Sequence, residues 1–267
     1  MKIIKQLFKS AAELNGFFVN TGVPKQAMLE AISLLHPLDT GYSLIRVGGS
    51  NDGGYLIPND LNGITACFSP GVADSARFEE DLINRFSIPC YLADYSINAA
   101  PIEHPLIEFD PYFIGTNPSE EYITFEAWVR QKVPQDDIGD LLLQMDIEGA
   151  EYDAIFSVSE KTLNRFRIII LELHGLNEMW STGSHNLFVS FLRKLTTNHY
   201  VVHNHFNNAC RTKKRNGIEI PNALEVTLHR KDRAKTRRYL KHYNNNLDQK
   251  NDLNNPFLQP SEIWFRA

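Results

Sequence analysis

The sequence predicts a Rossmann-like α/β fold in which helices cover both faces of a mostly parallel sheet. Apolar runs of strand length, such as 141–145 and 166–174, alternate with segments of helical periodicity. The segment 64–86 reads as a strand, a glycine turn and a helix, the repeating unit of such a fold. Because central parallel strands are buried on both faces, we expect the most hydrophobic run, FRIIILELH at 166–174, inside the sheet.

The chain of 267 residues has an ordinary globular composition, with 43% hydrophobic and 22% charged residues. Its net charge of −5 argues against a general attraction to nucleic acid or an acidic membrane. No apolar run approaches the ~20 residues that span a bilayer, and MKIIKQLFKSAAELNGFF lacks the apolar core of a secretory signal. The three cysteines form no C-x-x-C pair, so we expect reduced thiols and a cytoplasmic protein.

The first forty residues are expected to be helical, with Leu7, Ala11 and Leu14 on one face and a second helix after Pro24. This appendage could simply pack on the protein, or it could cover an acceptor pocket. The predicted organisation is a helical appendage at 1–40, a main domain at 41–243 and a tail at 244–267 that packs on the domain.

Residues 45–58, IRVGGSNDGGYLIP, are predicted to form two short strands around a glycine-rich turn. An ordinary hairpin turn explains the run from Asn51 to Gly54 as well as a binding loop does. In a binding loop, the bare glycine backbone would approach a ligand closely and Asp52 would be available to an ammonium group.

The strand at 64–71 ends at Gly71, and a helix capped by Asp74 or Ser75 is expected next. The turn lacks the G-x-G-x-x-G pattern of dinucleotide folds, which argues against NAD. The second strand, 90–94, ends in Asp94, at the distance from Gly71 where an acid holds ribose hydroxyls. A surface aspartate is the structural alternative, but an acid directly at the end of an apolar strand favours ligand contact.

A third strand is expected within 106–116, ending at Gly115-Thr116. The fourth belongs to LLLQMDIEGAEY, 141–152, and ends beside Asp146 and Glu148. Ligands of open α/β sheets bind outside the carboxyl ends of the strands, so these two acids lie where chemistry is expected. Glu151 is better explained as a negative charge that opens the next helix.

The fifth strand, 166–174, places Glu172 and His174 on one face, next to Asp146 if the fourth and fifth strands are neighbours. A buried histidine is often only a satisfied core residue. An acid and a histidine at one strand end are equally consistent with a functional pair.

Two later strands are expected to close the sheet, one of them antiparallel. The first, 200–208, carries His203 and His205 on one face, and the second is 221–231. The segment 230–241 holds seven lysines or arginines and one acid, which predicts either a solvated face or a site for a phosphate-bearing substrate.

Together these motifs resemble a known family. The order and spacing of GGSNDGGYLIP, ACFSPGVADSARFEEDL, YLAD, QMDIEGAEYDAI, IIILELHG, HNHFNN and IPNALEVTL are similar to those of FkbM-type S-adenosylmethionine-dependent methyltransferases. The resemblance covers about residues 44–231, and D-x-E-G-A-E at 146–151 is its most specific part. It implies the class I methyltransferase sheet, with six parallel strands and one antiparallel strand.

The resemblance also implies site residues. Gly71 would face the methionine part of S-adenosylmethionine, Asp94 its ribose, and Gly115-Thr116 its adenine, with Asp146 near the methyl group. The full set of residues expected to bind the cofactor is Asp52, Gly53, Gly54, Ser69, Gly71, Asp94, Gly115, Thr116 and Asp146. Members of the family commonly methylate oxygen atoms of sugars, so a carbohydrate or glycosylated small-molecule acceptor is expected.

A sugar hydroxyl is a weak nucleophile and needs a base, which predicts catalytic roles for Asp146, Glu148, His174 and His205. The alternative is a divalent cation, Mg, Mn or Zn, held by Asp146, His174 and His205, which would lower the pKa of the hydroxyl directly.

Two other classes of function remain open at this point. A nucleic-acid methyltransferase would use the basic segment 230–241, although the acidic net charge argues against it. A non-catalytic module that binds S-adenosylmethionine would have little need for the acids and the histidine at the strand ends.

Overall fold

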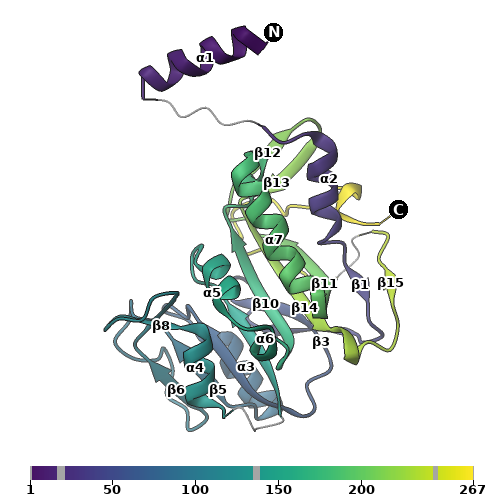
Figure 1. Cartoon of the computed structure of the whole chain (residues 1–267). Coiled ribbons are helices and arrows are strands. Elements are labelled where there is room, and N and C mark those ends of the chain that lie inside the picture. The colour runs from purple at the N-terminus through teal and green to yellow at the C-terminus, as the bar shows by residue number, and fades with distance from the viewer. Residues whose placement is uncertain (1, 17–21, 135–138, 243–245, 267) are drawn as a thin grey trace.

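The computed structural model describes residues 2–16, 22–134, 139–242 and 246–266, and its centre is a seven-stranded sheet (Figure 1). The strand order is β11-β14-β10-β9-β4-β5-β6, and every pairing is parallel except the two made by β14. This arrangement confirms the predicted fold class. The strands are β4 (Ile64–Pro70), β5 (Cys90–Ala93), β6 (Ile107–Asp110), β9 (Asp140–Met145), β10 (Phe166–His174), β11 (His199–Phe206) and β14 (Ala223–Arg230).

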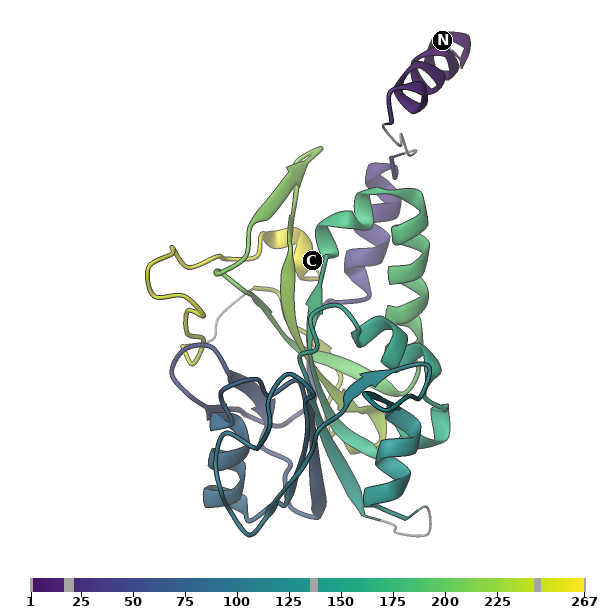
Figure 2. The same cartoon turned by 90° about the vertical axis from the view of Figure 1, so that its left-hand side faces the viewer.

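Helices cover both faces of this sheet (Figure 2). One face packs against α3 (Arg77–Phe86) and the antiparallel hairpin of β2 (Leu44–Gly48) and β3 (Gly54–Pro58). The other face packs against α2 (Lys25–Ser33), α4 (Phe125–Lys132), α5 (Glu151–Ser157) and α7 (Thr182–Asn198). The strand β10 lies between two neighbours and is buried along its length except at His174, as its hydrophobic sequence predicts.

Short elements complete the fold around these layers. They are α1 (Lys2–Leu14), α6 (Glu160–Leu163), the 3₁₀ turns η1 (Leu176–Trp180), η2 (Lys231–Arg233) and η3 (Glu262–Trp264), and the two-stranded pairs β1 (Leu38–Asp39) with β15 (Arg238–Tyr239), β7 (Phe113–Gly115) with β8 (Tyr122–Thr124), and β12 (Thr212–Arg215) with β13 (Ile218–Pro221). No helix in the described ranges is long and apolar enough to cross a membrane.

The third predicted strand requires a correction. It leaves the main sheet at Asp110 rather than at Gly115-Thr116, because Pro111 has no N–H to continue the ladder. Asp110 instead accepts hydrogen bonds from Trp128 (2.8 Å) and Lys132 (2.8 Å) of α4. Gly115 ends β7, which pairs with β8 in a separate small sheet.

The start of α3 also differs from the prediction. Its N-cap residue is Ala76, with no side-chain cap, rather than Asp74 or Ser75. Asp74 and Ser75 line a cavity instead, so these polar side chains face the space where a ligand would bind.

Both ends of the chain contribute to the same core. On α2, Met28 and Ile32 are fully buried, and Trp264 of the tail packs edge-on against Phe206. Within the first forty residues, predicted as one helical appendage, α2 packs on the domain and α1 is exposed. We propose that the folded domain begins at α2.

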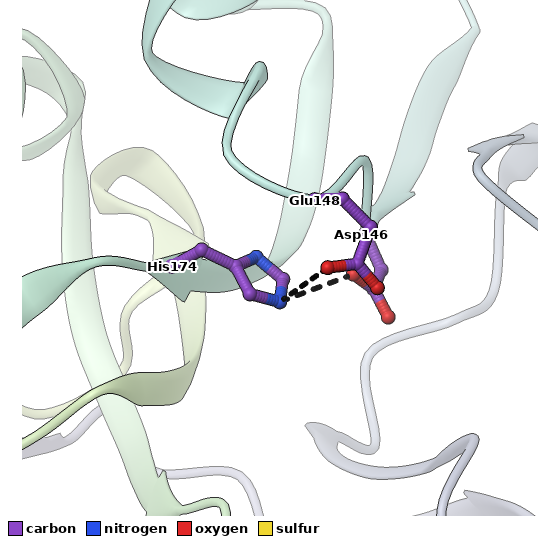
Figure 3. Close-up of side chains that lie close together, drawn as sticks. All are labelled: Asp146, Glu148 and His174. Atoms are coloured by element: carbon purple, nitrogen blue, oxygen red, sulfur yellow. Dashed lines mark ion pairs between the residues drawn. The ribbon is translucent and has the colours of Figure 1, made fainter. Parts of the chain in front are cut away.

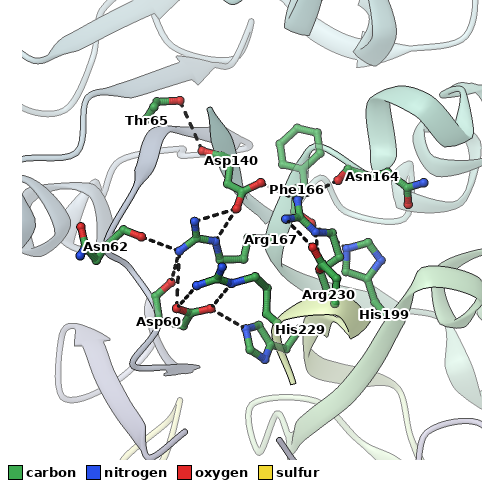
Figure 4. A network of polar contacts seen from close by, with 12 residues as sticks. Asp60, Asn62, Thr65, Asp140, Asn164, Phe166, Arg167, His199, His229 and Arg230 are labelled. Carbon is green, nitrogen blue, oxygen red and sulfur yellow. Dashed lines mark hydrogen bonds and ion pairs between the residues drawn. The ribbon is translucent and has the colours of Figure 1, made fainter. Parts of the chain in front are cut away.

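The amino-terminal edge of the parallel strands carries a network of paired charges (Figure 4). Arg167 binds Asp140 (2.7 Å), and Arg233 binds both oxygens of buried Asp60 (2.9 Å each). Arg230 also binds Asp140, at 2.6 Å. The basic segment 230–241 thus begins at the edge opposite the carboxyl ends of the strands, where its arginines neutralise acids of the fold.

Candidate active site

A tight turn after β4 sets the geometry of the site. Gly71 has φ +88°, and a Cβ at this position would lie 1.6 Å from the backbone oxygen of Asp146. Only glycine permits this approach of the turn to the end of β9. A cavity of about 320 Å³ opens there, lined by Asn51, Asp52, Gly53, Tyr55, Gly71, Val72, Ala73, Asp74, Ser75, Arg77, Phe78, Glu79, Gln144 and Asp146.

His174 and Asp146 meet at the carboxyl ends of the neighbouring strands β10 and β9 (Figure 3). The Nε2 atom of His174 lies 3.8 Å from Oδ1 of Asp146 and 3.6 Å from Oε2 of Glu148. Glu148 has φ +55° and an 87% exposed side chain, so it reaches the histidine from the solvent side. The meeting of Asp146 and His174 at one sheet edge was predicted from the sequence, and Glu148 joins them there.

Glu151 holds the other side of the imidazole ring. Its carboxylate is fully buried, and Oε1 lies 3.2 Å from Nδ1 of His174. The same oxygen accepts hydrogen bonds from the backbone N–H groups of Ile147 (2.9 Å) and Gly149 (3.3 Å). In the tautomer with a proton on Nδ1, His174 donates to Glu151 and presents a bare Nε2 toward Asp146 and Glu148.

This role of Glu151 was not predicted from the sequence, because an acid in the first turn of a helix already has a local explanation. The available signal was the spacing of D-x-E-G-A-E, in which the turn at Gly149 (φ +104°) folds Glu151 back beneath Asp146 and Glu148.

Burial and the neighbouring charges change the pKa values of both His174 and Asp146. Burial lowers the pKa of His174, but the hydrogen bond and charge of Glu151 and the charges of Asp146 and Glu148 outweigh it, so the pKa is raised. Burial raises the pKa of Asp146 to about 7, against the opposing charge of His174. Asp146 therefore exchanges its proton close to neutrality, where acid–base catalysts work best, beside a histidine whose charged form is favoured.

A row of polar groups continues across the same face of the sheet. Glu172 of β10 is directly opposite Glu225 of β14, which is opposite His205 of β11. Oxygens of Asp52, Glu172 and Glu225 lie within 4.8 Å of one another. Burial and the neighbouring acids raise the pKa of Glu172 well above its usual value.

Asn251 contacts these polar groups from the carboxyl-terminal tail, which is the yellow trace beside the β2–β3 loop in Figure 2. Its amide nitrogen donates to Asp52 (3.0 Å) and Glu225 (2.5 Å), and its oxygen lies 3.1 Å from Nε2 of His205. The asparagine-rich segment thus ties the hairpin loop to two strands of the sheet.

His205 does not join His174 among the contacts of the described residues. It lies 3.4 Å from Asp248, which also lies 3.1 Å from His203. Although burial lowers the pKa of His205, its bonds to Asp248 and Asn251 and the charge of Glu225 raise it overall. Of the three predicted metal ligands, Asp146 and His174 converge within 4.8 Å together with Glu148, so this trio, like the group of Asp52, Glu172 and Glu225 but without His205, has the geometry to hold a cation.

The residues expected to bind the cofactor fall into two groups. Asp52, Gly53, Gly71 and Asp146 line the cavity. The others lie outside the lining that the described residues form: Ser69 is buried against Glu79 and Gln144, Gly54 is buried in the hairpin, Gly115 ends β7, exposed Thr116 follows it, and Asp94 faces the turn.

Asp94 supports the turn that frames the cavity. One carboxylate oxygen accepts from the backbone N–H of Ala73 (2.9 Å), and the other accepts from the N–H (2.8 Å) and Oγ (2.6 Å) of Ser96. In this conformation the carboxylate holds two loops together at the ends of β4 and β5.

No curated protein gives a significant match to this chain. Residues 112–202 match the family model described as the methyltransferase FkbM domain, a segment that includes β9, α5 and β10 with Asp146, Glu151 and His174. This match, carried on a seven-stranded sheet with one antiparallel strand, supports the assignment of the chain to the FkbM-type methyltransferase family.

Proposed function

We propose that the protein is an S-adenosylmethionine-dependent O-methyltransferase that acts on a sugar hydroxyl. The observation that carries this proposal is the His174 imidazole, held at Nδ1 by buried Glu151 and directed at Nε2 toward Asp146, at the edge of a cavity. An imidazole oriented by a carboxylate is the arrangement of a general base.

The cavity suits the charges of S-adenosylmethionine. Its volume of about 320 Å³ falls within the ~300–1,000 Å³ range of small-molecule sites. Arg77 offers a cation for the cofactor's carboxylate, whereas Asp52 and Asp146 offer carboxylates for its ammonium and sulfonium groups. The Gly71 turn exposes backbone without side chains beside these groups. When bound, the cofactor would supply an activated methyl group on a good leaving group.

The residues of this chain would then align the acceptor and remove its proton. A bound cofactor would supply the methyl carbon to the acceptor oxygen, and its sulfur would keep the electron pair of the carbon–sulfur bond. The hydroxyl proton moves to Nε2 of His174, and Glu151 stabilises the imidazolium that forms. Asp146, close to Nε2, would orient the hydroxyl by accepting a hydrogen bond.

The polar row next to the pair supports a polyhydroxylated acceptor. Asp52, Glu172 and Glu225 present carboxylate oxygens, and although Asn251 or Asn207 already donates to each, a carboxylate can accept further hydrogen bonds. Several hydroxyl groups on one small molecule supply donors at the right density, which an apolar acceptor does not. The basic segment that would serve a nucleic acid begins at the opposite edge of the sheet, where Arg230 binds Asp140.

The experiment measures methyl transfer from S-adenosylmethionine to panels of saccharides, glycosylated metabolites and RNA. We expect products with saccharide acceptors, and roughly 10²-fold or greater loss of turnover in His174→Ala and Asp146→Asn. Cofactor affinity should stay largely intact in both variants. His242→Ala, which removes an exposed histidine away from the site, is the matched control. Transfer to RNA with none to saccharides would refute the proposed acceptor.

Chelation separates two forms of the mechanism. If His174 acts directly as the base, EDTA leaves wild-type turnover unchanged. If Asp146, Glu148 and His174 hold a divalent cation, EDTA abolishes turnover and added Mg, Mn or Zn restores it. Absence of any heat of binding with millimolar S-adenosylmethionine would instead refute the enzyme proposal and its cofactor together.

A further inference from the structure

The helix α1 exposes an apolar face that covers nothing in the described structure. Figures 1 and 2 both show α1 standing apart from the domain. The exposed fractions of its large apolar side chains are 74% for Ile3, 72% for Ile4, 65% for Leu7, 67% for Phe8 and 87% for Leu14. Single exposed apolar residues are common on proteins, but a contiguous group of this size marks an interaction surface.

The apolar residues of α1 share one side of the helix. Positions 3, 4, 7, 8, 11 and 14 follow the three- and four-residue spacing that places side chains on one face. Lys9 and Glu13 lie on the other side, 3.7 Å apart, together with positions 2, 5 and 6. Apart from Ala12, which falls on the polar side, the apolar positions of the helix lie together on one side.

The charge of α1 is opposite to that of the whole chain. The helix contains three lysines, at positions 2, 5 and 9, and one glutamate at 13, whereas the chain has a net charge of −5. Positions 2, 5 and 9 fall on the polar side of the helix, so an apolar surface bearing anionic groups would satisfy both sides at once. A second copy of the helix carries the same excess of positive charge, so it offers less charge complementarity than an anionic surface does.

We propose that α1 lies in the plane of an anionic lipid surface, with its apolar face among the acyl chains and its lysines at the headgroups. Its 13 residues extend about 20 Å, too short to cross a hydrocarbon core of ~30 Å. The attraction between the lysines of α1 and anionic headgroups acts over a short range, so the net negative charge of the whole chain does not oppose it. This proposal is independent of the proposed reaction, since α1 contributes no residue to the cavity or to the His174 pair.

The test is co-sedimentation of the full chain with vesicles of phosphatidylcholine alone or with phosphatidylglycerol added. We expect binding to anionic vesicles that is about a hundredfold stronger than to neutral ones, as three lysines near the surface predict, and that weakens with added salt. Because an isolated helix of this length is marginal in water, helical circular dichroism should increase on binding.

Paired substitutions test the apolar and the polar face of α1 separately. Leu7→Glu with Phe8→Glu should abolish vesicle binding, and Lys5→Glu with Lys9→Glu should remove the preference for anionic vesicles. Leu253→Glu is the matched control, because Leu253 is a similarly exposed (66%) apolar residue of the tail, and it should bind like wild type. Equal binding by wild type and the Leu7/Phe8 variant would overturn the proposal. So would a wild-type dimer in light scattering that this variant dissociates without any lipid binding, because the helix would then cover a second copy.

Discussion

Replacing Glu151 by glutamine tests whether this buried carboxylate positions His174. Glutamine keeps the shape and an oxygen that accepts from the backbone of Ile147 and Gly149. It removes the negative charge 3.2 Å from Nδ1 of His174. The substitution therefore alters the imidazole while leaving the turn that Glu151 supports.

The size of the effect follows from the bond that is lost. A hydrogen bond to a charged group contributes about 1.5–3 kcal/mol, so turnover should fall about 10- to 150-fold if that bond stabilises the imidazolium in the transition state. Glu151 is also the main group that raises the pKa of His174 against the effect of burial. Its neutral replacement should lower that pKa.

The assay is the pH dependence of turnover at saturating cofactor. A base works in its neutral form, so activity rises as the pH passes the apparent pKa of the Asp146–His174 pair. In Glu151→Gln, this rise should occur at lower pH than in wild type, although the maximum is smaller. A merely structural role would reduce the maximum and leave the pH of the rise in place, and that result would refute the reasoning.

A matched control is Glu126→Gln. Glu126 likewise accepts from a backbone N–H, that of Ser159 at 2.9 Å, but on α4, without contact to His174. It should leave turnover and its pH dependence unchanged.

Two further substitutions test the turn beside the cavity and the charge network at the opposite edge of the sheet. Asp94→Ala releases the backbone N–H of Ala73, so calorimetry should show S-adenosylmethionine binding weakened by about 1–3 kcal/mol, and unchanged affinity would remove Asp94 from the site. Asp60→Asn removes the charge that Arg233 binds, while Arg167 keeps Asp140, and should reduce the free energy of unfolding by about 1.5–3 kcal/mol in denaturant titrations. Burial raises the pKa of Asp60, but its hydrogen bond to Arg233 and the charge of Arg167 lower it overall. Wild type should therefore lose this contribution as the pH falls below about 3.8 through the folded-state pKa, whereas in the variant this step should be absent.

Local patterns were sufficient to predict the parts of the site that lie at strand ends. Apolar runs that stop at Gly71 and Asp146 identify the carboxyl ends of β4 and β9, and strand neighbourhood then brings His174 beside Asp146. The same reasoning failed for the third strand, because the run around Pro111 stays apolar after the ladder has ended. Hydrophobicity does not distinguish one strand from two short ones.

The contacts made by the tail could not be predicted, because no local pattern specifies a partner almost fifty residues away. His205 was expected beside His174, yet the tail supplies Asp248 and Asn251, which take both of its ring nitrogens. Asparagine-rich sequence predicts a loop and is silent on where the loop packs. The role of Glu151 was hidden for a different reason, since its position already had a sufficient structural explanation in the helix dipole.

The two ends of the sheet use charge in opposite ways. At the amino-terminal edge, Asp60 and Asp140 each meet arginines at 2.6–2.9 Å, so the buried carboxylates there are neutralised and strengthen the fold. At the carboxyl edge, carboxylates gather around His174 without an arginine or lysine among their described ion-pair partners.

Like charges brought together in this way oppose folding, and the pKa of Asp146 rises to about 7 as a result of its burial and these neighbours. Folding stability alone would favour an edge where each of the carboxylates around His174 is paired with an arginine or lysine or is absent. Their arrangement is understandable if this edge is built to accept donors and a proton from a bound molecule, which is what methyl transfer to a hydroxyl group requires.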